Sequence, residues 1–131
     1  MKLKTFNKSN LPIMPTGKPT IRFSKSAGLI TFSKQAGINL GLTDKTRVEL
    51  CQNEEEPTDW YIHITTSQSA FELRRKDDAV NYTFNATPLV RKVLETLKIE
   101  HAASFIISGE PHIIGSEKYF YIITGNPIGA K

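Results

Sequence analysis

Alternation of hydrophobic and polar residues predicts β-strands along most of the chain after residue 20. Ile21 and Phe23 alternate with polar neighbours, and after a turn at residues 26–28 the stretch 29–32 has the same strand-forming composition. These residues predict a hairpin whose buried side is formed by Ile21, Phe23, Ile30 and Phe32.

A short helix and two further strands are expected next. Ser33 stands where an N-cap residue would, and apolar residues at helical spacing run to Gly41, so the pattern predicts a helix of about two turns. Residues 48–50 and the alternating stretch 60–65 then predict two strands. The first half of the chain is therefore expected to be a β-β-α-β-β unit.

The second half follows the same order. Strand-like stretches occur at 71–75, 82–84, 103–108 and 118–124, and a capped helix is expected from Thr87–Pro88, with Leu89, Val90, Val93, Leu94 and Leu97 on one face. The offset between matching positions grows from 50 (residues 21 and 71) to 59 (residues 59 and 118), which small insertions explain. Two β-rich halves can also look alike because strands share a chemistry.

The expected fold class is therefore α+β and β-rich. Two similar β-β-α-β-β halves, at about 20–66 and 70–125, would form a pseudo-symmetric sheet or barrel-like single domain over residues 20–131, so that one chain imitates a symmetric dimer. Residues 1–19 contain three prolines and little periodicity, and they are expected to form an extended basic arm.

Charge is distributed unevenly along the chain. The net charge is +4, but residues 1–43 contain seven basic residues and no Asp or Glu, which leaves 10 basic against 13 acidic residues in the remainder. A patch of one sign attracts phosphate even when the total charge is modest. A solvated, lysine-bearing tail is the alternative explanation.

The sequence contains no pattern typical of catalysis. Cys51 is the lone cysteine and lies in an expected strand, the three histidines are far apart in sequence, and the glycines do not form a phosphate-binding loop. Glu54, Glu55 and Glu56 are expected to be a solvated turn. We therefore expect no enzyme activity, no metal site and no cofactor.

No stretch of the sequence is apolar enough for a membrane span, and no apolar segment follows Lys2 and Lys4. A single cysteine cannot form an internal disulfide, which fits a reducing compartment. The expected location is cytoplasmic, with no membrane partner.

The stretches 28–42 (GLITFSKQAGINLGL) and 46–50 (TRVEL) carry a family resemblance. They run from a glycine through an apolar strand, a short helix and a Leu-Gly-apolar step to a return strand with valine at its centre. In this order, over about residues 20–65, the chain resembles the AbrB/MazE-like swapped-hairpin family. The resemblance implies a bacterial DNA-binding regulator or antitoxin, a family whose intertwined dimers present basic residues from the hairpins to DNA.

The sequence departs from the family pattern at several positions. Ser33 replaces the usual proline, Gly37 stands where a DNA-contacting arginine is common, and Lys45 replaces the glycine before the return strand. Lys34 alone matches a basic position, and residues 85–88 (NATP) replace the signature in the second half. The resemblance therefore implies the fold more directly than the contacts.

These features together predict a DNA-binding protein, either a transcriptional regulator or a mobile-element accessory factor. The phosphate contacts are expected from Arg22, Lys25 and Lys34 in the first half and from Arg74, Arg75 and Lys76 in the second. One alternative is single-stranded nucleic-acid binding, with Trp60, Tyr61, Tyr119 and Tyr121 as stacking platforms. Another is an antitoxin-like protein-interaction or assembly module that docks its N-terminal arm on a protein partner.

Overall fold

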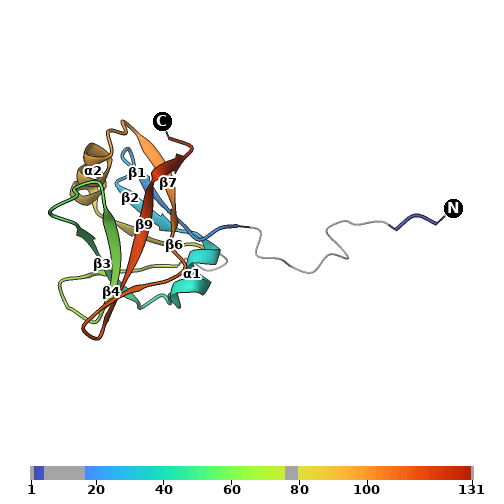
Figure 1. Cartoon of the computed structure of the whole chain (residues 1–131), viewed down its shortest axis with the longest axis horizontal. Helices are drawn as coiled ribbons and strands as arrows, with labels where there is room; N and C mark the ends of the chain where they lie inside the picture. The colour runs from blue at the N-terminus through green and yellow to red at the C-terminus, as the bar shows by residue number, and fades with distance from the viewer. Residues whose placement is uncertain (1, 5–16, 76–79, 131) are drawn as a thin grey trace.

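The computed structural model describes residues 2–4, 17–75 and 80–130 (Figure 1). Most of the N-terminal arm, at residues 5–16, and Lys76 lie outside the described residues. The elements of the first half are β1 (Thr20–Ser24), β2 (Leu29–Phe32), α1 (Lys34–Leu40), β3 (Arg47–Gln52) and β4 (Trp60–Thr65). Those of the second half are β5 (Phe71–Glu72), β6 (Tyr82–Asn85), α2 (Thr87–Thr96), β7 (Ala102–Ile107), β8 (His112–Ile114) and β9 (Glu117–Ile128).

The strands form one antiparallel sheet that curls into a nearly closed barrel. Its order is β5-β3-β4-β9-β7-β1-β2-β6, with β8 added beside β9. The segment that begins with β5 joins the two ends of this order, since Phe71 pairs with Val48 on β3 and Arg74 pairs with Thr83 on β6. The expectation of an α+β, strand-rich fold is confirmed.

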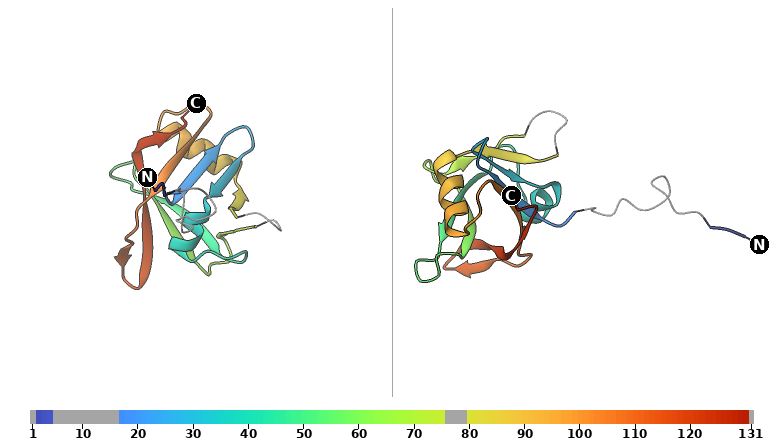
Figure 2. Two further views of the ribbon diagram at one scale, coloured as in Figure 1. Left: turned by 90° about the vertical axis from the view of Figure 1, so that its right-hand side faces the viewer. Right: turned by 90° about the horizontal axis from the view of Figure 1, so that it is seen from above.

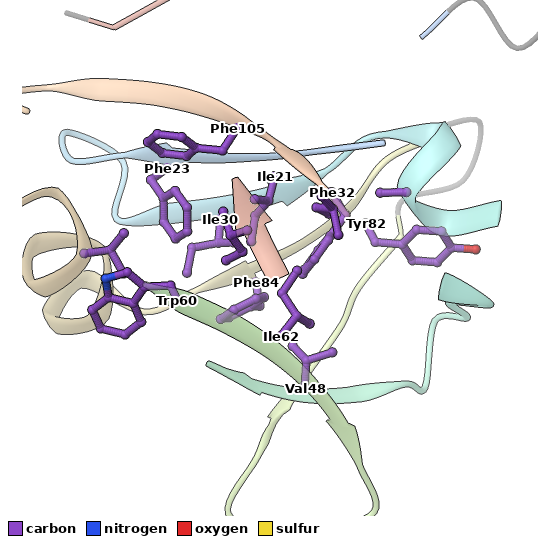
Figure 3. Close-up of a cluster of buried hydrophobic side chains, with 14 of the residues drawn as sticks. Ile21, Phe23, Ile30, Phe32, Val48, Trp60, Ile62, Tyr82, Phe84 and Phe105 are labelled. Atoms are coloured by element: carbon purple, nitrogen blue, oxygen red, sulfur yellow. The ribbon is translucent and has the colours of Figure 1, made fainter. Parts of the chain in front are cut away.

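Apolar side chains from opposite walls fill the interior of the barrel (Figure 3). Ile21, Phe23, Ile30 and Phe32 are each 0% exposed, which confirms the buried side predicted for the first hairpin. They pack with Phe84 and Phe105 from the neighbouring strands β6 and β7, and with Ile62 and Ile122 from β4 and β9. Because β1, β2, β6 and β7 are buried on one face only, their alternate residues point outward from the barrel.

Helix α1 has the predicted caps. The Ser33 hydroxyl accepts a hydrogen bond from the Ala36 amide, and Gly41 ends the helix with a left-handed φ of 67°. A Cβ atom on Gly37 would lie 2.8 Å from a ring carbon of Tyr82, because the tyrosine packs directly against the helix. This contact leaves no room for a larger side chain at position 37.

Helix α2 starts differently from the prediction. Its N-cap is Ala86, which makes no side-chain capping bond, so the expected cap at Thr87 is wrong and Thr87 is the first residue of the helix. The Thr87 side chain instead fills the space beside Gly28, where a Cβ would approach its hydroxyl oxygen to 2.1 Å. The Ala86 amide also donates to the Gly28 carbonyl, so the β1–β2 turn is fastened to the start of α2.

The second half contains a strand that was not predicted. β8 and the first residues of β9 form a hairpin that projects from the body of the barrel (Figure 2). The last strand also extends to Ile128, beyond the predicted end at residue 124. Gly115 lies in the turn at the tip of this hairpin.

Neither helix in the described part of the chain has both the length and the hydropathy required to cross a membrane.

Candidate nucleic-acid interface

A row of polar residues crosses the outer face of the barrel. Arg22 on β1 is directly opposite Thr31 on β2, Thr31 is opposite Thr83 on β6, and Thr83 is opposite Arg74. The row continues past Arg22 to Ser104 on β7. We call these five residues the arginine–threonine row. Two of the arginines predicted to bind phosphate thus lie on one face, with two hydroxyl groups between them.

The strands beneath this row carry no negative charge. β1, β2 and β6 contain no Asp or Glu, and α1 has no acidic residue in its first turn. The barrel therefore presents donors on strands without a carboxylate at this part of its described surface, and the nearby Glu72, two residues before Arg74, is paired with Arg47. Such a surface suits a polyanion, because phosphate oxygens accept hydrogen bonds from guanidinium, hydroxyl and amide groups.

The arginine side chains are oriented by local hydrogen bonds. Arg22 Nη1 donates to the Ser104 hydroxyl at 3.3 Å, and Arg74 donates to the Asn85 side-chain carbonyl. Asn85 in turn donates to the Ala27 carbonyl at 3.3 Å. These bonds use one N–H group each, and a guanidinium has five, so both arginines keep donors for a ligand.

An open pocket of about 590 Å³ lies over β2 and β6. It is lined by Leu29, Thr31, Arg74, Arg75, Asn81, Thr83 and Asn85. Arg75 is held at this pocket because its guanidinium lies 5.7 Å from the centre of the Tyr82 ring and donates to the Tyr82 hydroxyl. The pocket therefore combines two arginines with two side-chain amides.

The other predicted phosphate ligands lie away from this centre. Lys25 is exposed in the β1–β2 turn, and Lys34 is exposed at the start of α1, which follows the opposite end of the same hairpin. The structure therefore brings Arg74 and Arg75 together at one pocket and places Arg22 on the same outer face, beyond β2 and β6. The two lysines lie at the ends of the hairpin, whereas Lys76 is outside the described residues.

The face formed by β3, β4 and β9 has a different character. Tyr61, Tyr119 and Tyr121 are half-buried on its outer side, with Glu49, Asp59 and Glu117 among them. Burial and the hydrogen bond to Asp59 raise the pKa of Tyr121, so its hydroxyl stays protonated at neutral pH. We call this surface the acidic tyrosine face.

Trp60 does not belong to the acidic tyrosine face. It is 3% exposed, and its indole Nε1 donates to the Thr96 hydroxyl of α2 at 3.0 Å. The hypothesis that Trp60 is a stacking platform is therefore wrong, because β4 turns its even-numbered side chains toward the core.

His63 is the one polar residue among the described buried side chains. Its Nδ1 lies 2.8 Å from Glu49 and its Nε2 lies 3.0 Å from Glu117, and its ring stacks on Tyr119 at 4.5 Å. Burial by itself lowers the pKa of His63, but its hydrogen bonds to Glu117 and Glu49 and their charges outweigh burial and raise it. The wide separation of these residues in sequence concealed this cluster, and only strand register reveals it.

Cys51 has the properties of a structural thiol. Burial, with a smaller effect from the charge of Glu49, raises the pKa of this thiol, which leaves little thiolate to act as a nucleophile at neutral pH. Within the described ranges no three His, Cys, Asp or Glu side chains converge in a way that could hold a metal ion.

The chain was compared with protein-family models, with curated proteins and with solved structures, and none of the three comparisons produced a match.

Proposed function

We propose that this protein binds DNA through the outer face of β1, β2 and β6. The observation that carries the proposal is the arginine–threonine row, in which Arg22 and Arg74 flank two paired threonines on strands without carboxylates. Phosphates would contact the arginines, and the lysines at the ends of the hairpin would extend the contact along the backbone. A regulator of transcription or an accessory factor of a mobile element would use such a surface.

We further propose that the two halves are a duplication related by a local twofold axis. Exchanging β1 with β5, β2 with β6, β3 with β7 and β4 with β9 leaves the set of strand pairings unchanged, if Arg74 is counted with β5. β8 is the only described strand outside this scheme. A twofold face matches duplex DNA, which has its own twofold relation between strands.

The pairings refine the alignment of the proposed halves. Arg22 is opposite Thr31, and Arg74 is opposite Thr83, so Arg74 corresponds to Arg22 in the proposed repeat. The sequence spacing had indicated that Arg74 corresponds to Ser24. The alignment of β4 with β9 changes by one residue from the one that the sequence spacing indicated. Buried Ile62 then corresponds to Phe120, and not to half-exposed Tyr121. A shift of one residue would exchange the two faces of a strand, so burial supports the new alignment.

The resemblance to swapped-hairpin proteins agrees with this proposal. That family implies two intertwined hairpins, and here β1 pairs with β7 while β5 pairs with β3, so each half completes the sheet of the other. Both hairpins would come from one chain.

Fluorescence anisotropy with labelled DNA tests the proposed function. We expect the full chain to bind duplex DNA at about 50 mM salt and to bind it at least tenfold more weakly at about 200 mM, because each phosphate contact releases counterions. The double variant Arg74→Ala/Arg75→Ala should weaken binding about tenfold and lower the slope of log K against log salt by about 2.

The matched control removes the same charge elsewhere. Arg91 and Lys92 are exposed on α2 and line no part of the pocket, so Arg91→Ala/Lys92→Ala should retain most of the affinity. Absence of duplex binding at low salt, or equal losses in both double variants, would rule out the proposed interface.

Duplex DNA is favoured over a single strand by the charge on the acidic tyrosine face. Single-strand binding would need Tyr61, Tyr119 and Tyr121 to stack on bases, and the carboxylates among them would repel the phosphates of that strand. Competition between single-stranded and duplex oligonucleotides distinguishes the two ligands.

Assembly through the N-terminal arm is the second candidate function. The observation that favours it is charge complementarity: residues 1–19 contain Lys2, Lys4, Lys8 and Lys18 without an acidic residue, whereas the acidic tyrosine face has three carboxylates. If the arm joins copies or partners, removal of residues 2–18 should lower the oligomeric mass. If the arm clamps phosphate, removal should weaken DNA binding alone.

A further inference from the structure

The histidine on the acidic tyrosine face occupies an unusual position in the sheet. Glu49 on β3 is directly opposite His63 on β4, and His63 is opposite Tyr119 on β9. Tyr119 is in turn opposite His112 on β8. The His63 side chain is 9% exposed, and both of its ring nitrogens contact a carboxylate. One side chain therefore connects β3 to the start of β9.

This geometry requires a particular protonation state. A neutral imidazole has one N–H donor, and an ionised carboxylate can only accept hydrogen bonds. Two carboxylates at 2.8 and 3.0 Å can both be hydrogen-bonded only when both ring nitrogens carry a proton. Loss of one proton would place a nitrogen lone pair against a carboxylate oxygen, and that contact must open or hydrate.

The two carboxylates differ in how easily they can move away. Glu49 lies in the middle of β3, which is paired on both sides with β4 and β5. Glu117 has a side chain 54% exposed, is the first residue of β9, and pairs with Ile114 next to the turn at Gly115. Within the described part of the chain β8 pairs with β9 alone, so the β8–β9 hairpin is held by fewer strand pairings than β3.

We infer that His63 is a proton-controlled latch on the β8–β9 hairpin. In its doubly protonated form it holds Glu117 against the barrel, and on losing a proton it releases Glu117 and loosens the hairpin. The residues that move would include Ile113 and Ile114, which are each 66% exposed at the tip. The latch therefore makes the presentation of this apolar tip dependent on pH.

Other titratable and charged groups surround the latch. Arg47 on β3 is paired with Glu72 at 3.1 Å, so it does not neutralise Glu49 directly. Among the described residues, the remaining groups on this side of the neighbouring strands are Cys51, Tyr61, Tyr119, Tyr121, the Asp59 that is bonded to Tyr121, and His112. His112 is the second histidine among these groups, and it lies in the hairpin itself.

Nuclear magnetic resonance titration of the full chain tests the latch. The ring signals of His63 and the methyl signals of Ile113 and Ile114 would be followed from about pH 5 to about pH 9, the range in which histidine titrates. We expect the methyl signals to change with the same midpoint as His63, above the value of 6.5 for a free imidazole. A His63 midpoint below 6.5, or methyl signals that do not change at the His63 midpoint, would overturn the inference.

Two variants separate the latch from simpler causes. Glu117→Gln should lower the His63 midpoint and abolish the coupled change at Ile113 and Ile114. His112→Gln removes the histidine inside the hairpin and should leave the coupled change intact. If His112→Gln abolishes the change and Glu117→Gln preserves it, the signal belongs to His112 and the latch does not exist.

Discussion

Arg22 and Arg74 lie in one row across the barrel, separated only by the directly opposed residues Thr31 and Thr83. Because the two arginines come from different halves of the chain, one ligand that covers the row would contact both halves. The relationship leads to a quantitative expectation for DNA binding.

The single variants Arg22→Ala and Arg74→Ala should each lower the slope of log K against log salt by about 1, and the double variant by about 2. Anisotropy titrations at several salt concentrations measure this slope, with Arg91→Ala as the control for a general loss of charge. An unchanged slope for Arg22→Ala would limit the interface to the second half.

The turn at Gly28 should tolerate substitution much less than the helix end at Gly41. Both glycines have left-handed φ values, of 59° and 67°, so alanine costs about 1–2 kcal/mol of backbone strain at either position. Only Gly28 also contacts Thr87, and this overlap should add about 1–3 kcal/mol. Urea unfolding of Gly28→Ala and Gly41→Ala measures the difference, and equal losses would show that Thr87 does not fill the space.

The hydrogen bond between Trp60 and Thr96 should stabilise the contact of the barrel with α2. Thr96→Val keeps the volume but leaves the indole N–H buried without an acceptor, at a cost of about 1–3 kcal/mol. Thr96→Ser retains the hydroxyl and is the matched control, with an expected loss below about 1 kcal/mol. The free energy of unfolding of both variants checks this, and a loss in Thr96→Ser as large as that in Thr96→Val would show that the hydroxyl is not what stabilises the contact.

Stability should depend on pH through His63. Its pKa is raised in the folded state, so its stabilising contribution is complete below about 6.5, the ordinary pKa of histidine, and is lost as pH rises through the folded value. Wild-type protein should therefore unfold at lower urea concentrations at pH 8.5 than at pH 5.5, and His63→Gln should reduce this difference. A difference of the same size in the variant would assign the pH dependence to other groups.

The local pattern of the sequence was sufficient for the first β-β-α-β-β unit. Ile21, Phe23, Ile30 and Phe32 alternate with polar residues, and Ser33 and Gly41 have the short-range capping roles that these residues prefer. Such features depend on residues within a few positions of one another, so they can be predicted without knowledge of the fold. The start of α2 could not, because Thr87 meets Gly28 only after distant segments pack together.

By itself, the sequence determined the strands of the first half, where α1 begins and ends, and that the first 43 residues carry positive charge without a carboxylate. Only the tertiary structure decided which strands are neighbours. Strand register placed Arg22 opposite Thr31 and Arg74 opposite Thr83. It also placed His63 between Glu49 and Glu117, although His63 and Glu117 are 54 positions apart in the sequence. The physical reason is that pairing between distant strands depends on the common core they enclose, which no local pattern contains.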